Sequence, residues 1–188
     1  MAKVKKNVVM KGLSGMLGDQ VVVKQDKGGR TIVSVKPTFP EDRELSAAQQ
    51  KQVEAFKEAA HYAKAASKTE AIYAEKAEDT PRSGYNVAIA DWFHEPEIGE
   101  IDLSGWTGQA GQPIRIKAMD DVQVERVTVL ITDAEDVLLE QGSAAPEDGL
   151  WWVYTTTQTA SDQPKVIAIA RDLPGNIARL VAEAQGIA

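Results

Sequence analysis

Three carboxylates in the last third of the chain form the residue set with the most chemical potential. Asp120 and Asp121 follow one expected strand, and Asp172 ends a later strand and opens the stretch Asp172–Asn176. We expect these two strands to run the same way, which would bring the carboxylates to one end of the fold. Ca²⁺ takes about six to eight oxygen ligands, so three residues are too few. Turn capping by each aspartate is therefore the favoured interpretation, and Ca²⁺ binding is the alternative.

A glycine-rich stretch near the N-terminus, GLSGMLGDQ, has a spacing that suggests a phosphate-binding loop. Its glycines recur at every third position, at Gly12, Gly15 and Gly18. A Walker A loop ends in Gly-Lys-Ser/Thr, whereas Asp19 follows here and would repel phosphate. The dinucleotide-binding fingerprint has a strand before it and a helix after it, and here a strand follows. We interpret the stretch as a flexible lead-in to a strand, because glycine gives backbone freedom.

Catalytic groups are sparse along the chain. Cysteine is absent, which excludes disulfides and thiolate metal sites. The two histidines, His61 and His94, are 33 residues apart, and neither lies in a recognisable triad context. No serine lies in a nucleophile-elbow motif. We therefore expect no catalytic residues, no enzymatic activity, no metal and no cofactor.

The tryptophans raise the question of a carbohydrate-stacking surface. Trp151 and Trp152 are adjacent in an expected strand, so one faces the core and the other faces outward. The outward one, together with Trp106 or Trp92, could stack on a sugar. Packing between parts of the chain is the favoured use, because tryptophan buries a large area. We expect His94 to be a polar residue at such a joint.

Residues 1–40 are expected to form a basic β-hairpin. Val21–Gln25 and Arg30–Val35 are β-branched runs joined by Asp-Lys-Gly-Gly. Residues 1–30 carry a net charge of +5 and the remainder carries −12, which suggests an electrostatic partner. A lone hairpin is marginal in water, so it docks either within its own chain or on a neighbour. The residues expected at this assembly contact are Gly12, Gly15, Gly18, Val21, Val22, Val23, Ile32, Val33 and Val35.

Residues 41–95 are expected to be helical. Ser46 and Gln49 have the spacing of a capping box, and the pattern recurs at Ser67 and Glu70. We therefore expect one helix after Ser46, a second over Lys68–Glu78, and a third over Tyr85–Phe93 with Ser83 as its cap. The apolar face of the first helix would carry Val53, Phe56, Ala60 and Ala63.

Residues 96–188 change to the two-residue period of β-strands. Ile114, Ile116 and Ala118 alternate on one side of a strand, and a later strand has the same pattern at Val127, Val129 and Ile131. Seven short strands with turn signals between them predict a Greek-key β-sandwich of immunoglobulin type without its disulfide. The expected fold class is α+β, with an N-terminal β-hairpin, a short helical segment and a C-terminal immunoglobulin-like (Ig-like) β-sandwich.

The same stretch resembles a known group of modules. The pattern IRIKAMDDVQVERVTVLITDAEDVLLEQGSA, then WWVYTTT, then VIAIARDLPGN is similar to bacterial Ig-like and cadherin-like modules. This resemblance covers Glu97 to about Val181 and implies a fold. The first 95 residues, with GLSGMLG, GRTIVS and AQQKQVEAF, are similar to uncharacterised bacterial proteins that carry an Ig-like tail. That family supplies no activity.

These patterns favour a structural or assembly subunit that self-associates into rings or filaments through its N-terminal hairpin. The expected partner is another copy, giving a homo-oligomer or polymer, or else a different protein. The alternative is an Ig-like binding module for carbohydrate or protein. Nucleic acid is not favoured, because the basic segment lacks interleaved aromatic residues. No membrane span is expected, and the chain is expected to be cytoplasmic when made, with signal-peptide-independent export left open.

Overall fold

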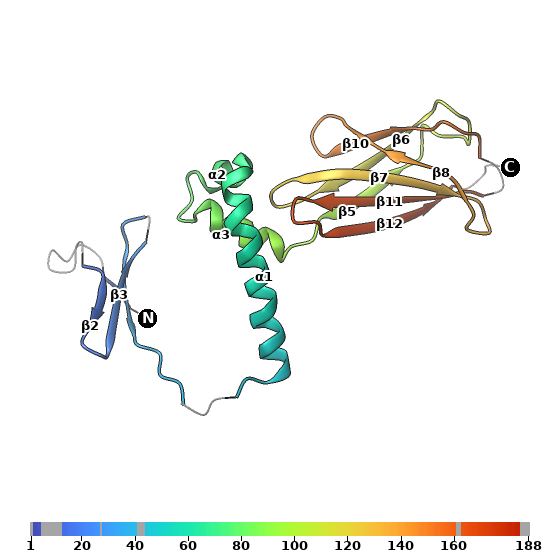
Figure 1. Cartoon of the computed structure of the whole chain (residues 1–188). Helices are drawn as coiled ribbons and strands as arrows, with labels where there is room; N and C mark the ends of the chain where they lie inside the picture. Colours follow the sequence, from blue (N-terminus) through green and yellow to red (C-terminus); the bar gives the residue numbers. More distant parts are fainter. Residues whose placement is uncertain (1, 5–12, 27, 41–43, 161–162, 185–188) are drawn as a thin grey trace. The chain divides into compact units, whose positions relative to one another are not determined.

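The structure is a computed structural model that describes residues 2–4, 13–26, 28–40, 44–160 and 163–184 (Figure 1). The chain divides into two units, Met1–Ile89 and Ala90–Ala188. Across the described residues there are three helices and three antiparallel four-stranded sheets, as an α+β fold requires. None of the helices in these ranges is both long and apolar enough to cross a bilayer.

The first unit opens with a four-stranded sheet in the order β1-β4-β3-β2. The predicted hairpin is confirmed as β3 and β4, and Gly29 N–H donates to the Asp26 carbonyl at 3.0 Å in its turn. Two flanking strands were not predicted. One of these two strands, Gly15–Leu17, lies in the glycine-rich stretch. The interpretation of that stretch as a flexible lead-in was therefore wrong for these three residues. The strands are β1 (Ala2–Val4), β2 (Gly15–Leu17), β3 (Val21–Gln25) and β4 (Thr31–Val35).

Two glycines of this sheet adopt backbone conformations with positive φ. Gly15, in β2, has φ of +121°, and Gly18, in the turn before β3, has φ of +55°. Residues with a Cβ rarely adopt such angles. Pairing with β3 thus turns part of the glycine-rich stretch into a strand, while Gly12 lies outside the described residues.

Three helices follow: α1 (Ala47–Thr69), α2 (Ala71–Ala77) and α3 (Gly84–Trp92). The capping box at Ser46 is confirmed, and Ser83 Oγ accepts the Asn86 N–H at 3.2 Å before α3. The second box was wrong. Nothing in the sequence around Ser67 breaks the helix, so α1 continues to Thr69. Glu70 then precedes α2 without a side-chain capping bond.

The apolar face of α1 is covered along only part of its length. Ala59, Ala63 and Ala66 are buried, and Tyr62 and Tyr73 meet through their hydroxyl groups at 2.7 Å. In the N-terminal half, however, Val53 and Phe56 are exposed. The predicted face therefore exists, but burial begins about three turns into the helix.

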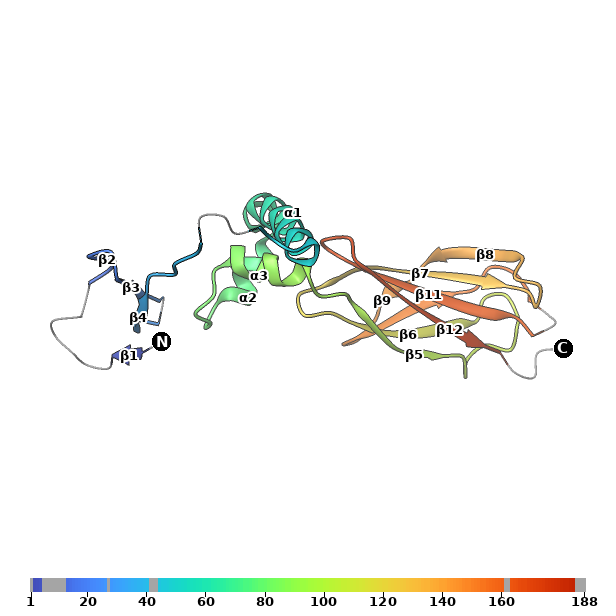
Figure 2. The same cartoon turned by 90° about the horizontal axis from the view of Figure 1, so that it is seen from below.

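The second unit contains two four-stranded antiparallel sheets (Figure 2). Their orders are β5-β6-β10-β9 and β12-β11-β7-β8. Seven of the eight strands match the predicted ones, and the two-residue β9 was not predicted. The strands are β5 (Glu97–Asp102), β6 (Pro113–Met119), β7 (Val124–Thr132), β8 (Leu138–Ser143), β9 (Ala145–Pro146), β10 (Trp151–Thr155), β11 (Lys165–Asp172) and β12 (Ile177–Glu183).

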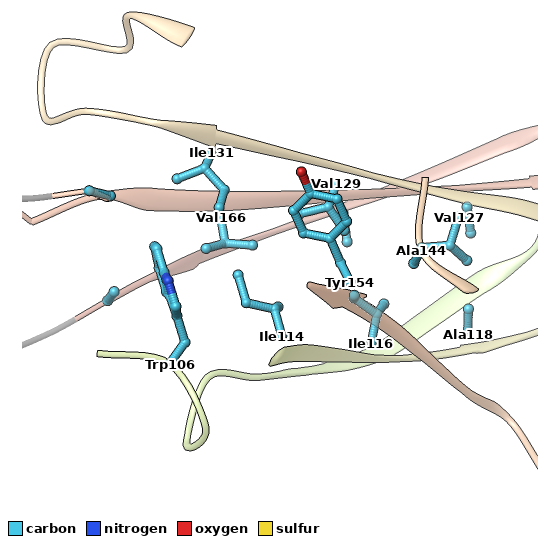
Figure 3. Close-up of a cluster of buried hydrophobic side chains, with 14 residues drawn as sticks. Trp106, Ile114, Ile116, Ala118, Val127, Val129, Ile131, Ala144, Tyr154 and Val166 are labelled. Carbon is cyan, nitrogen blue, oxygen red and sulfur yellow. The ribbon is translucent and has the colours of Figure 1, made fainter. Parts of the chain in front are cut away.

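Side chains from both sheets meet in one core (Figure 3). The predicted alternation is confirmed: the inward residues of β6 and β7 are all buried. Tyr154 from β10 and Trp106 from the β5–β6 connection complete the cluster. The core residues predicted from the pattern are Ile114, Ile116, Ala118, Val127, Val129 and Ile131.

A buried carboxylate joins the two sheets. Glu140, in β8, accepts hydrogen bonds through Oε2 from the Thr157 N–H at 2.9 Å, the Thr157 hydroxyl at 2.5 Å and the Gln158 N–H at 2.9 Å. Thr157 and Gln158 follow β10, which belongs to the opposite sheet. The carboxylate therefore holds the end of β10 against β8.

Packing around Tyr154 makes Gly142 a sensitive position. A Cβ there would lie 2.6 Å from Tyr154 Cε2, inside any real contact distance. We expect Gly142→Ala to lower the free energy of unfolding by about 1–3 kcal/mol, because the ring must move within a packed core. Urea unfolding followed by tryptophan fluorescence measures this.

Gly99→Ala is the matched control for that substitution. Gly99 is also in a strand, and its added Cβ would meet Met119 Cε at 3.7 Å and Lys117 Cδ at 4.0 Å, both ordinary contacts. We expect a change within about 0.5 kcal/mol. Equal effects of the two substitutions would contradict the packing described around Tyr154.

Candidate functional site

The strongest grouping of titratable residues lies at one end of the second unit. Asp91, Asp120 and Asp172 each place a carboxylate oxygen within 4.8 Å of the other two. Asp91 is 1% exposed and Asp172 is 0% exposed, while Asp120 is half-buried. The acidic cluster, as we name these three residues, contains two of the three residues considered from the sequence.

The third member differs from the one expected. Asp121 is exposed and outside the cluster, because the chain turns directly after β6 and Asp120 caps this turn. Asp91 takes its place from the last turn of α3. It lies inside a segment expected to be helical, where a lone aspartate gives no signal of a distant carboxylate partner.

Turn capping, the favoured interpretation, is confirmed for Asp120 and Asp172. Asp120 Oδ1 accepts the backbone N–H groups of Val122 at 2.8 Å and Gln123 at 2.9 Å. Asp172 Oδ1 accepts the Gly175 N–H at 2.8 Å. Each cap uses Oδ1 of its aspartate, so Oδ2 is left outside the cap. Asp120 Oδ2 is buried and has no hydrogen-bond donor within the described residues.

Asn176 connects the β11–β12 loop by hydrogen bonds to the end of α3 and to the residues just after it. Its Nδ2 donates to Asp172 Oδ2 at 2.7 Å and to the His94 carbonyl at 3.0 Å. The carbonyls of Trp92 and Asp91 lie slightly farther, at 3.3 and 3.4 Å. An amide has two hydrogens, so four oxygens share two donors. The surroundings of the cluster are thus rich in acceptors.

Electrostatics oppose three ionised carboxylates at this spacing. Burial raises the pKa of Asp172 above its ordinary value of 3.8, and the neighbouring charge of Asp120 raises that pKa further. Carboxylate and carbonyl oxygens are the ligands that Ca²⁺ prefers, so these three residues are the ones that could hold a cation.

Beside the cluster is a hollow of about 580 Å³. His94 borders it, and its Nδ1 lies 2.6 Å from Asp121 Oδ2. Both side chains are exposed, so His94 is a surface residue within this unit. We call this feature the acidic hollow, and its lining residues are Phe93, His94, Glu95, Glu97, Met119, Asp120 and Asp121.

Trp106, Trp151 and Trp152 do not form an open stacking surface. Trp106 is buried and Trp152 packs against the core, so neither presents a free ring face. Trp151 faces the other way, and the Arg115 guanidinium lies over its ring at 5.1 Å from the centroid. Arg115 also pairs with Glu147 at 2.5 Å. The outward aromatic face is therefore covered by a cation from the same unit.

Comparison with known proteins gives no family. No family model and no curated protein matches the chain. Three solved structures are similar over about half of this chain. An engineered protein has a TM-score of 0.38 and 19% identity, covering 53% of this chain and 26% of that one. The chain therefore spans about a quarter of that protein's length.

The other two similar structures are bacterial proteins. CopC from Methylosinus trichosporium OB3b has a TM-score of 0.36 and 14% identity, covering 47% of this chain and 90% of that one. A conjugative transposon lipoprotein from Bacteroides eggerthii DSM 20697 has a TM-score of 0.26 and 9% identity, covering 49% and 96%. Similarity at this level supports no assignment of family or function.

Repulsion within the acidic cluster predicts a stabilising substitution. Asp120→Asn keeps the Oδ1 cap and removes one negative charge beside Asp172. We expect the free energy of unfolding at pH 7 in EDTA to rise by about 1 kcal/mol. The raised pKa of Asp172 means that the folded state holds its proton more tightly than the unfolded state. The contribution of Asp172 to wild-type stability therefore falls as pH rises from 3.8 through its folded pKa, and the variant's advantage disappears in acid.

Asp133→Asn is the control, because Asp133 caps a turn in the same way outside the cluster. Its Oδ1 accepts the N–H groups of Glu135 at 3.0 Å and Val137 at 2.8 Å. We expect no gain from this substitution. Urea unfolding of both variants at several pH values measures the difference. A loss of stability for Asp120→Asn at pH 7 would contradict the account of repulsion.

Proposed function

We propose that this chain is a non-enzymatic assembly subunit that self-associates through its N-terminal sheet. The observation that carries the proposal is a row of apolar side chains open to solvent. Leu17 is 48% exposed and Val35 is 80% exposed. Exposed apolar side chains grouped on one surface are typical of a contact with another protein.

Strand register places these side chains together. Leu17 is opposite Val21, and Val21 is opposite Val35, so the three form a row across β2, β3 and β4. Directly opposed residues in antiparallel strands share a face. The next row on that face is Gly15, Val23 and Val33. We call this surface the valine face, and its residues are Gly15, Leu17, Val21, Val23, Val33 and Val35.

The mode of contact follows from the sheet order. Both strands of the hairpin have partner strands on each side, since β4 pairs with β1 and β3 pairs with β2. Their backbone groups are therefore used within the chain, and strand addition could occur only at β1 or β2. Val23 is already buried within the chain, so burial of the exposed end of the valine face, Leu17 and Val35, against a second copy is the better supported contact. Val22 and Ile32 point to the opposite face, where Lys24 also lies.

The second unit supplies the body of the proposed subunit. Its two sheet orders support the expectation of an immunoglobulin-like sandwich, because they correspond to the ABED and GFC arrangements with one added edge strand. A contact between the N-terminal sheet and a different surface of the next copy would be heterologous. Such contacts produce rings when they close and filaments when they do not.

Replacing the exposed row with polar residues tests the proposal. We expect the wild type to exceed its monomer mass of 20.4 kDa in light scattering after gel filtration. Leu17→Gln/Val35→Gln is expected to weaken association about a hundredfold, because each buried aliphatic side chain contributes about 1.5–3 kcal/mol. Amide resonances of β3 and β4 report whether the sheet stays folded.

A matched control uses exposed apolar residues elsewhere. Ile177→Gln/Val181→Gln changes two side chains of β12 that are 60% and 45% exposed. We expect this variant to associate as the wild type does. A monomeric wild type at high protein concentration would overturn the proposal, and so would equal weakening by both double variants.

A further inference from the structure

We infer that the acidic hollow of one copy binds the lysine-rich N-terminal segment of a second copy. This inference rests on the proposed function and names the surface that receives the N-terminal region. The hollow is lined by Phe93, His94, Glu95, Glu97, Met119, Asp120 and Asp121, and no lysine or arginine is among these residues.

Carboxylates predominate in the lining of the hollow. Four of its seven lining residues are acidic, whereas Glu147 and Asp136 elsewhere in the unit pair with Arg115 at 2.5 Å and with Lys165 at 2.7 Å. Glu95 and Glu97 have no ion pair within 4.0 Å among the described residues, and both are exposed. Glu95 and Glu97 therefore keep negative charges at the hollow, while Asp121 is partnered by His94.

The walls of the hollow suit a lysine side chain. Phe93 is exposed and Met119 is half-buried, so both offer apolar surface beside the carboxylates. A lysine buries its methylene stem against apolar groups while its ammonium group remains with polar partners. Carboxylate acceptors and an aromatic ring both attract that ammonium group.

Charge complementarity selects the occupant. Residues 1–30 carry a net charge of +5, with Lys3, Lys5, Lys6 and Lys11 close together in sequence. Residues 90–188 contain 17 acidic and 6 basic residues, a net charge of −11. A contact between a basic segment and an acidic hollow joins two different surfaces. Every copy can therefore insert its own segment into one neighbour and accept the segment of another neighbour in its hollow.

Reciprocal charge reversal tests this inference on the full chain. The hollow variant is Glu95→Lys/Glu97→Lys, and the segment variant is Lys3→Glu/Lys5→Glu/Lys6→Glu. We expect each alone to raise the dissociation constant of self-association about tenfold at about 100 mM salt. Mixed one to one, each variant offers what the other lacks, and association should return to within about threefold of the wild type.

Glu135→Lys/Asp148→Lys is the charge-matched control, because both residues are exposed in loops and neither lines the hollow. We expect it to associate as the wild type does. If the hollow variant associates as strongly as the control variant, the inference is overturned. The same result is expected if the segment occupies the hollow of its own chain, because association would then not depend on the hollow. Failure of the mixture to associate would overturn it as well.

The valine-face variant separates this failure from failure of the proposed function. If Leu17→Gln/Val35→Gln is monomeric while the hollow variant associates normally, the assembly role stands and the acidic hollow is not its acceptor. If the wild type is a monomer at every concentration, the proposed function itself falls, and this inference falls with it.

Discussion

Burial of β-branched side chains on one face of each sheet is the constraint on which this structure depends. In the second unit the constraint is met inside the chain, because the inward residues of β6 and β7 lie in one core between two sheets. In the N-terminal sheet it is met only in part: Val23 is buried, whereas Val35 at the end of the valine face is exposed. The same physical requirement is thus met inside the second unit and leaves part of the N-terminal sheet exposed.

The two-sheet core also positions the charged end of the second unit. Asp120 follows β6 and Asp172 ends β11, so the strand directions bring their carboxylates together. Asn176 connects this loop to the last turn of α3, which contributes Asp91, and to His94 just after the helix. Glu95 and Glu97, which lie in the adjacent hollow with no ion pair among the described residues, raise the local negative potential, and such potentials steer basic partners.

Sequence patterns predicted the parts of the fold that depend on local periodicity. The hairpin at β3 and β4, the cap at Ser46 and seven strands of the second unit follow from spacing alone. Long-range pairing could not be predicted: β2 is a strand only because β3 lies beside it. In the acidic cluster, equal strand direction predicted that Asp120 and Asp172 meet, but Asp91 comes from a helix whose position depends on tertiary contacts.

The central proposal is that the exposed end of the valine face, Leu17 and Val35, is covered by another copy, and hydrogen exchange measured against protein concentration tests it most directly. Amide exchange of β2–β4 would be followed by mass spectrometry from dilute to concentrated solution, with β10 and β11 as the internal reference. The account predicts that protection of β2–β4 rises with concentration while that of β10 and β11 stays constant. Protection of β2–β4 that is the same at every concentration would contradict it.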